Sequence, residues 1–332
     1  MNQQDPLKKN RLGLGGILLV SGGVLVASGA FLLPDPGLLA GNAQMAPLPD
    51  ARATTATDGA ATGSPSDASA ERPTGPTDAV RPLVPVYWLG GDGGEERLFR
   101  EYLATPEDTV GDPIADAVRL MTSGRPLDPD YHSSWRPASS VSSSISTKNV
   151  ITLDISSDAF PERLGEDQGR LALQQLVYTA TAAAADAGLI AGGEASSVVV
   201  LVDGAADRRV FGSVDLDGAW TRDAATLAPL WIIDPQEGTR SDAGTLTVHG
   251  VGPASEDALD WRIERSSDGS ATDGSRLFGD GSVDVVRQDG APGAYSFPVT
   301  LPPGRYEITV SVPSGDASGE GASADSKTVV VR

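Results

Sequence analysis

The longest run of uncharged, mostly apolar positions lies near the N-terminus of the chain. Residues 12–33, from Leu12 to Leu33, contain no charged side chain, and Pro34 follows them directly. At about 1.5 Å of rise per residue, an α-helix of this length spans the roughly 30 Å hydrocarbon core of a bilayer. The pattern therefore predicts a single transmembrane helix over residues 12–33.

Charges on the two sides of this run predict its orientation. Lys8, Lys9 and Arg11 precede it, and Asp35 follows it. Because basic flanking residues stay on the cytoplasmic side, we expect residues 1–11 to form a cytoplasmic tail and the later domains to be extracytoplasmic. A cleaved signal peptide is the alternative, but its apolar core normally runs about 7–15 residues, which favours an uncleaved anchor.

Three glycines recur at intervals of seven within the predicted membrane helix. Gly15, Gly22 and Gly29 therefore lie on roughly one face of it. Small residues let two membrane helices approach closely, so these glycines form a candidate helix-packing stripe. Glycine is also common in membrane helices in general, and this reading stays open beside the first.

Bulky apolar residues become rare after the predicted anchor. Residues 34–82 consist largely of Ala, Thr, Ser, Gly, Pro and Asp. Such a segment buries too little apolar surface to offset the entropy of ordering the chain, so we predict a disordered linker. Its root-mean-square reach is about 35–45 Å by the flexible-chain relation, which would hold the folded part away from the membrane.

Residues 83–238 alternate between strand-like and helix-like patterns. Short apolar runs predict strands at 84–89, 141–147, 150–155 and 197–202. Asp112 is the expected cap of a helix that begins at Pro113 and ends at Gly124. A second helix, with one apolar face, is expected at about 166–186. This order of β-α-β-β-α-β favours a two-layer α+β domain with a partly antiparallel sheet.

Residues 239–332 show the alternation of apolar and polar positions that is typical of antiparallel strands. From Thr245 onward, apolar residues occupy every second position around Trp261, Phe297 and Ile308. Clusters rich in Asp, Gly and Pro separate these stretches, including the Asp280–Gly281 pair, which we interpret as a turn. About 88 residues with this pattern predict an immunoglobulin-like β-sandwich.

Composition limits the partners of the chain. Its formal net charge is −20, and it contains no cysteine. An acidic surface is repelled by phosphate backbones, so we exclude nucleic acid as a partner. The absence of cysteine excludes disulfides, thiolate chemistry and acylation of an N-terminal cysteine.

His132 is the first candidate for acid–base chemistry. It lies in the segment 128–134, which also holds two aspartates, a tyrosine and two serines. A hydrolase needs a nucleophile held by a base and an oxyanion site, and no strand–turn–helix elbow surrounds these serines. We therefore predict a turn with Tyr131 and Trp135 packed on the sheet, and no catalytic residue. The other histidine, His249, is interpreted as a residue of a strand-end turn.

Motifs for phosphate or metal binding are equally incomplete. The glycine-rich loop 90–94 follows a strand, but it carries Asp92 and no lysine, which opposes phosphate binding. Acidic segments at 215–218 and 280–284 offer oxygen ligands for Ca²⁺ but lack the further spaced ligands of an EF-hand loop. We therefore predict no metal site and no cofactor.

Several of these stretches together resemble a known domain family. The matching stretches are Val86–Trp88, Asp112–Leu120, Pro126–Tyr131, Gln174–Thr179 and Val198–Gly204. With them, residues 84–222 resemble the GerMN (sporulation and spore germination) domain. Residues 245–331 resemble the immunoglobulin-like domain of bacterial spore germination, through the stretches 248–250, 259–262, 302–306 and 327–329.

The resemblance implies a bacterial envelope protein without catalytic activity. GerMN domains are similar to ring-building modules of trans-envelope assemblies, so we expect a scaffold or adaptor that contacts envelope proteins or other copies of itself. This chain has one GerMN copy rather than two and lacks a lipobox cysteine, so a general envelope role stays open beside sporulation or germination. Binding of cell-wall glycan (peptidoglycan) is the alternative, and a hydrolase is the third reading. Aromatic residues make up only 5% of the chain, which disfavours a glycan platform.

Overall fold

The computed structural model describes residues 81–91, 95–107, 109, 111–190, 195–266, 275–288, 291–313 and 323–332. The predicted tail, the transmembrane helix with its glycine stripe, and the linker up to residue 80 lie outside these residues. Among the helices that the structure describes, none is both long and apolar enough to cross a membrane.

The chain first forms a β-hairpin of which only one strand was predicted. Strand β1 (Leu83–Gly90) pairs antiparallel with β2 (Arg97–Ala104), and the glycine-rich loop belongs to the connection between them. Sequence patterns miss β2 because charged residues, among them Glu101, interrupt its apolar positions. Glu101 is nevertheless buried, at 2% exposure. The element order is therefore β-β-α-β-β-α-β.

A three-stranded sheet follows, close to the predicted positions. Strands β3 (Val141–Ile145) and β4 (Val150–Ile155) are antiparallel, and β5 (Ser197–Val202) lies parallel to β4. Asn149 adopts a φ of 56° in the turn between β3 and β4. The partly antiparallel sheet is confirmed, but β1 belongs to the separate hairpin sheet.

Both predicted helices are present. Helix α1 (Pro113–Ser123) is capped by the Asp112 carboxylate, which accepts the N–H groups of Ile114 and Ala115 at 3.1 and 3.0 Å. Helix α2 (Glu166–Asp186) has the predicted bounds. The two helices pack on each other and on β1.

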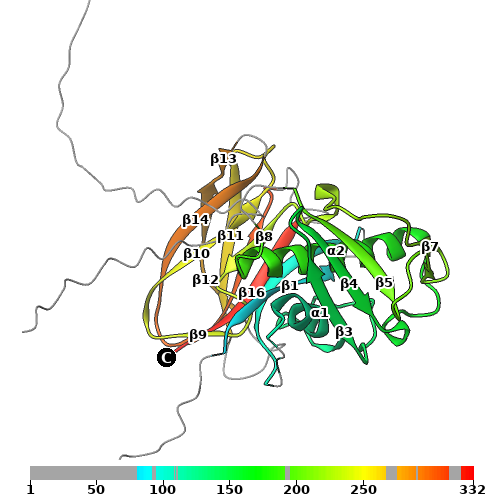
Figure 1. Cartoon of the computed structure of the whole chain (residues 1–332). Helices are drawn as coiled ribbons and strands as arrows, with labels where there is room; N and C mark the ends of the chain where they lie inside the picture. Colours follow the sequence, from blue (N-terminus) through cyan, green and yellow to red (C-terminus); the bar gives the residue numbers. More distant parts are fainter. Residues whose placement is uncertain are drawn as a thin grey trace, which may run out of the picture. The chain divides into compact units, whose positions relative to one another are not determined.

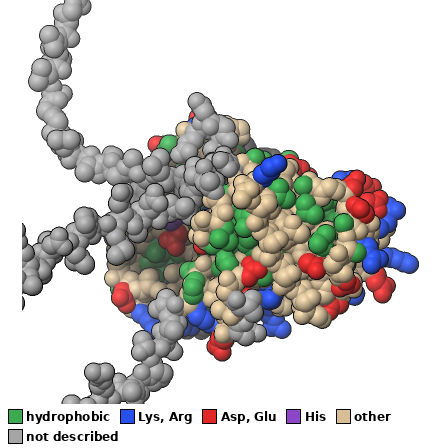
Figure 2. All heavy atoms as spheres, viewed as in Figure 1, with side chains coloured by type: hydrophobic (Ala, Val, Ile, Leu, Met, Phe, Trp, Pro, Cys, Tyr) green, Lys and Arg blue, Asp and Glu red, His purple; other side chains and the backbone are tan. Residues whose placement is uncertain are grey.

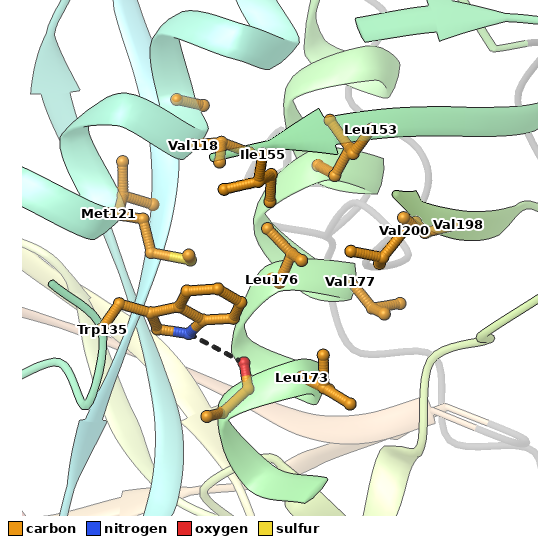
Figure 3. Close-up of a cluster of buried hydrophobic side chains, with 14 of the residues drawn as sticks. Val118, Met121, Trp135, Leu153, Ile155, Leu173, Leu176, Val177, Val198 and Val200 are labelled. Carbon is orange, nitrogen blue, oxygen red and sulfur yellow. Dashed lines mark hydrogen bonds between the residues drawn. The ribbon is translucent and has the colours of Figure 1, made fainter. Parts of the chain in front are cut away.

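Helix α2 is buried on more than the one face that its sequence predicts. Its residues are buried without a break from Ala172 to Ala184. Figures 1 and 3 show the reason, since α2 lies between the β1–β2 hairpin and the strands β4 and β5. On the hairpin side, Gln175 Nε2 donates to the Tyr87 carbonyl at 2.9 Å. The predicted two-layer arrangement is thus incomplete, because the hairpin covers a second side of this helix.

Short elements lead from β5 to the second half of the chain. They are the two-residue strands β6 (Arg209–Val210) and β7 (Val214–Asp215) and the 3₁₀ helix Ala224–Thr226, whereas another 3₁₀ helix, Ser157–Ala159, lies earlier, between β4 and α2. We call residues 81–230 the α+β half and residues 231–332 the sandwich.

The sandwich consists of two sheets. One has the order β13-β14-β10-β8, formed by Val286–Gln288, Ala291–Leu301, Gly244–Gly252 and Trp231–Asp234. The other has the order β12-β11-β15-β16-β9, formed by Arg276–Asp284, Ala258–Arg265, Gly304–Ser311, Ala324–Val331 and Thr239–Ser241. Side chains of both sheets share one apolar core, in which Trp261 stacks on Phe297 at 5.0 Å between ring centroids. These sheets agree with the predicted immunoglobulin-like sandwich.

Strand β8 connects the two halves. It precedes residue 239, where the predicted second domain begins, yet it pairs with β10 of the sandwich. Trp231 packs into the core of the α+β half, while the next residue, Ile232, packs into the core of the sandwich. Leu230, just before β8, also packs into the core of the sandwich, so successive residues of this segment alternate between the two cores.

Candidate functional site

The most unusual chemistry in the structure is a buried group of charged side chains between the two halves, which we call the charge cluster: Glu101, Asp128, Tyr131, Asp325 and Lys327. At its centre is Lys327 on β16, which is 3% exposed. Its Nζ donates to Asp128 Oδ2 at 2.5 Å, to the Tyr131 hydroxyl at 2.7 Å and to Asp325 Oδ1 at 2.9 Å. All three ammonium protons therefore have acceptors, two of which come from the α+β half.

Asp325 holds the cluster to the sandwich. Its Oδ1 also accepts the hydroxyl proton of Tyr131 at 2.9 Å, and its Oδ2 accepts the N–H of Ile232 on β8 at 2.7 Å. The ring of Tyr131 stacks on Phe99 of β2 at 4.6 Å between centroids. One carboxylate thus joins strands from both sheets of the sandwich to the hairpin side of the α+β half.

Glu101 on β2 orders the segment that presents Asp128. Its two carboxylate oxygens accept the consecutive N–H groups of Leu127 and Asp128, both at 2.9 Å. Asp128 in turn accepts the N–H of Asp130 at 3.0 Å. The aspartate that meets Lys327 is therefore fixed by a second buried carboxylate rather than by packing alone.

The link after β8 is bound to both halves as well. Gln236 accepts the N–H of Tyr102 on β2 and donates to the carbonyl of the same residue. The neighbouring Glu237 accepts the N–H of Thr328 on β16. This second set of contacts lies beside the charge cluster along the same two strands, so the halves are joined at more than one point.

Burial and neighbouring charges change the pKa values of three side chains in the charge cluster. Desolvation raises the pKa of the Asp325 and Glu101 carboxyls above their ordinary values, although backbone and lysine contacts oppose it. For Lys327, burial acts to lower the pKa, but the charges of Asp325 and Asp128 outweigh it and raise the pKa. Lys327 is therefore held as an ammonium ion, and a protonated amine cannot act as a nucleophile.

The structure separates the residues that the sequence placed in one acid–base segment. Asp128 and Tyr131 belong to the buried charge cluster, whereas His132 Nε2 pairs with Glu96 Oε1 at 3.0 Å on the surface. The Ser133 hydroxyl lies 3.2 Å from the side-chain nitrogen of Gln175. Among the described residues, no hydrogen bond joins His132 to a serine hydroxyl. These residues therefore do not form a nucleophile–base pair.

The predicted structural role of this segment is confirmed. Tyr131 and Trp135 are both buried, each at 6% exposure. Trp135 packs beside α2, and its Nε1 donates to the Ala172 carbonyl at 3.1 Å, as Figure 3 shows. The aromatic side chains thus anchor the segment to the helix and the hairpin.

Two other predicted details are wrong. His249 lies inside β10, opposite Ser296 of β14, rather than in a strand-end turn. Asp280 and Gly281 belong to strand β12 rather than to a turn. Glycine occupies position 281 because the Trp261 ring covers it, and a Cβ there would lie 2.7 Å from the ring. The glycine is required for packing, which the sequence pattern does not distinguish from a turn.

Within the part of the chain that the structure describes, no three His, Asp or Glu side chains converge as metal ligands. Asp215 lies in β7, and Gly218 has the positive φ of a turn residue, 74°. The predicted membrane-helix residues Leu12, Leu33, Gly15, Gly22 and Gly29 lie outside the described residues.

Sequence reasoning missed Lys327, Asp325 and Glu101. The sequence does contain an indication that Asp325 and Lys327 are buried. Both occupy the same alternate positions of β16 as the buried Val329 and Val331. A lysine on the inward face of a strand needs a buried counter-ion. The identity of that counter-ion, Asp128, could not be read from the strand.

Comparison with known proteins finds a family match within the α+β half. Residues 85–207 match the family model Germane, described as sporulation and spore germination. A search of curated proteins finds no match.

Among solved structures, the tandem GerMN domains of the sporulation protein GerM from Bacillus subtilis are similar at 18% identity, with a TM-score of 0.34. The match covers 45% of this chain and 49% of that one, so the chain spans about half the length of that structure. An engineered protein (12% identity, TM-score 0.22, 49% and 36% of the two chains) and a marsupial T cell receptor (13%, 0.21, 37% and 39%) also match. The family model confirms the predicted GerMN resemblance: residues 85–207 form a domain of the sporulation and spore germination type.

Proposed function

We propose that this chain is a non-catalytic scaffold or adaptor of the bacterial envelope, anchored by the predicted helix at residues 12–33 and acting through protein–protein contacts. The supporting observation is the role of the two side chains in the segment 128–131 that could have carried acid–base chemistry. Asp128 and Tyr131 are buried and bonded to Lys327 of the sandwich. They hold two domains together instead of facing a substrate.

A fixed connection suits a scaffold. A protein that positions partners must present its two domains at a constant distance and angle, and interfaces between domains of one chain are mobile by default. Here the charge cluster, the bonds of Gln236 and Glu237, and the shared strand β8 all oppose such motion. We therefore assign the joined halves, rather than either domain alone, as the working unit.

The surface of the α+β half is compatible with binding to other proteins, although the view in Figure 2 does not mark one face as the binding surface. Figure 2 shows small groups of hydrophobic side chains scattered among polar and charged ones over the α+β half. The membrane anchor, the extracytoplasmic position and a link to sporulation or germination belong to this proposal as well. They rest on the apolar run, its basic flank and the family match.

Expression of the full chain in bacterial cells tests the anchor. We expect the protein to stay in the membrane pellet after alkaline carbonate extraction and to become sensitive to protease when the outside of the membrane is exposed. Release by carbonate, or protection from external protease, would contradict the anchored, N-in arrangement.

The scaffold role is tested against the glycan alternative by two measurements on the same detergent-purified chain. Purified peptidoglycan should not retain it above the level of an unrelated acidic protein. Chemical cross-linking in cells should join it to defined envelope proteins or to further copies. Specific retention on peptidoglycan without protein cross-links would favour the glycan-binding alternative, and hydrolysis of peptidoglycan by the purified chain would overturn the non-catalytic reading.

A further inference from the structure

Strand β12 is an end strand of the five-stranded sheet of the sandwich, and no other strand among the described residues pairs with its far side, which we call its open side. Val285, directly after it, donates its N–H to the Asp257 carbonyl at 2.9 Å, in register with the β11–β12 pairing. Alternate residues of an antiparallel strand direct their backbone groups to the same neighbour. Asp280, Ser282 and Asp284 therefore turn their N–H and C=O groups away from β11, toward the open side.

Strands at the ends of the other sheets are closed by specific hydrogen bonds. On β3, the N–H of Ser143 donates to the Asp112 carboxylate at 3.2 Å. On β5, Val198 exchanges backbone hydrogen bonds of 2.7 and 2.8 Å with Trp220. The outer sides of β3 and β5, which could otherwise template a further strand, are thus each bonded to another part of the chain.

The same holds for the hairpin and for β8. The closing contacts are Tyr87 N to Thr179 Oγ1 on β1, Tyr102 N to Gln236 Oε1 on β2, and Ile232 N to Asp325 Oδ2 on β8. Beyond its short partner β13, strand β14 carries Pro298, which has no N–H to donate. The end strands β9 and β13 have only three residues each. By contrast, β12 has nine, and no hydrogen bond to its outward backbone groups occurs among the described residues.

The outward face of β12 carries negative charge. Asp280 and Asp284 are exposed on this face, and Asp260 of β11 is the register partner of Ser282 between them. Among the described residues, none of these three carboxylates belongs to an ion pair, whereas the nearby Arg262 pairs with Glu264. A strand added beside β12 would place its side chains directly opposite Asp280 and Asp284, with Asp260 one strand further away.

We propose that the open edge of β12 binds an extended, basic segment of a partner protein as a sixth strand. The segment carries Lys or Arg at two positions four residues apart, opposite Asp280 and Asp284. Backbone hydrogen bonds to 280, 282 and 284 supply affinity, and the carboxylates supply specificity. This inference rests on the proposed scaffold role and narrows its partner to a chemical class.

Charge argues for a basic partner over a second copy of this chain. Each copy has a formal net charge of −20, so two copies repel each other. In a two-fold pair of β12 strands centred on Ser282, Asp280 of one copy faces Asp284 of the other. In a pair centred on Asp280, that carboxylate faces its own equivalent. Like charges directly opposite destabilise strand pairing.

The test uses the full chain in a non-ionic detergent and two synthetic peptides. One peptide is Lys-Val-Thr-Val-Lys-Val-Thr-Val-Lys, which presents lysines four residues apart on one face of a strand. Its twin has glutamate in place of lysine. We expect saturable binding of the lysine peptide only, with slower amide hydrogen exchange in the segment 280–284.

Matched variants separate strand addition from simple charge attraction. Both Ser282→Pro and Ser282→Ala remove the hydroxyl that donates to the Leu259 carbonyl of β11 at 3.2 Å, but only Ser282→Pro also removes the N–H on the unpaired side. Ser282→Pro should therefore weaken peptide binding about tenfold, whereas Ser282→Ala should bind like the wild type. If Ser282→Pro does not fold, the double variant Asp280→Lys/Asp284→Lys keeps every backbone donor and should also bind about tenfold more weakly.

The inference would be overturned by equal binding of the Pro and Ala variants, by no slowing of exchange at 280–284, or by no binding of the lysine peptide to the wild type. A dimer of the full chain that Ser282→Pro dissociates would overturn it in favour of self-association. Each of these results leaves the membrane-extraction and cross-linking outcomes untouched, so failure at β12 is distinguishable from failure of the scaffold role.

Discussion

Lys327 and Asp128 are 199 positions apart in the chain, yet Nζ and Oδ2 lie 2.5 Å apart and both side chains are 3% exposed. The pair joins the last strand of the sandwich to a turn of the α+β half. Buried charges are expensive unless they are paired and hydrogen-bonded, and here each partner has further bonds. We therefore expect this ion pair to hold the two halves in a constant relative position. The substitutions below distinguish its contribution to stability from that of apolar packing.

Replacing the buried lysine should destabilise the protein strongly. Lys327→Met keeps much of the side-chain volume but leaves Asp128 and Asp325 without their cation. Removing one partner of a buried pair typically costs about 3–5 kcal/mol. Urea unfolding, followed by tryptophan fluorescence, measures it. Lys148→Met, at an exposed turn, is the control and should change the free energy of unfolding by less than about 0.5 kcal/mol. Similar values for both variants would contradict the role of the cluster.

Glu101→Gln should also destabilise, although the two side chains have nearly the same shape. Each carboxylate oxygen of Glu101 accepts a backbone N–H, from Leu127 and Asp128. The amide of glutamine would turn its NH₂ group toward one of these donors and leave it unsatisfied, at a cost of about 1–3 kcal/mol. The same change at the exposed Glu162 is the matched control. If Glu101→Gln unfolds at the wild-type denaturant concentration, the carboxylate does not hold this turn.

Substitutions of the neighbours Tyr131 and His132 should destabilise the protein to clearly different extents. Tyr131→Phe removes a hydroxyl that bonds Asp325 and Lys327, and we expect a loss of about 1–3 kcal/mol. His132→Ala removes a surface ion pair with Glu96 and should cost less than about 1 kcal/mol. Thermal unfolding of the two variants side by side checks this contrast. A larger loss of stability for His132→Ala than for Tyr131→Phe would make His132 a candidate functional residue again.

The stability of the protein at acid pH should depend on the ionisation of Asp158. Hydrogen bonds from the Ser139 and Ser156 hydroxyls lower its pKa to about 2 in the folded state. Because the folded pKa lies below the unfolded value of about 3.8, its contribution to stability is present above that value and is lost as pH falls through about 2. The difference in urea midpoint between the wild type and Asp158→Asn should therefore shrink as pH falls from about 4 to 2. The exposed Asp217→Asn serves as control, and a difference that stays constant with pH would contradict the prediction.

Gly281→Val tests the packing of Trp261. A Cβ at position 281 would lie 2.7 Å from the indole ring, so any side chain there must displace it. We expect a loss of about 1–3 kcal/mol, as is typical of overpacking, and a shift in tryptophan emission. Ser282→Val, one residue away on the outward face of β12, should leave the unfolding temperature near that of the wild type. Equal stability of the two variants would show that the ring moves aside freely.

Local signals predicted much of the fold because they act over a few residues. The Asp112–Pro113 start of α1 and the bounds of α2 follow from capping and helical periodicity. The family resemblance rests on the same stretches. Strand β2 escaped because the buried Glu101 breaks its apolar pattern, and Gly281 was misplaced because packing glycines and turn glycines look alike in sequence.

Neighbouring residues and composition are thus enough to predict both helices, most of the strands of the α+β half and the acidic, cysteine-free chemistry of the chain. Three features appear only in the folded molecule: Lys327 bonds to Asp128, α2 is enclosed from two sides, and the segment around β8 packs into both cores. These features depend on which surfaces meet after the chain has folded back on itself. That pairing is fixed by the sum of many distant contacts, and no short window of sequence contains it.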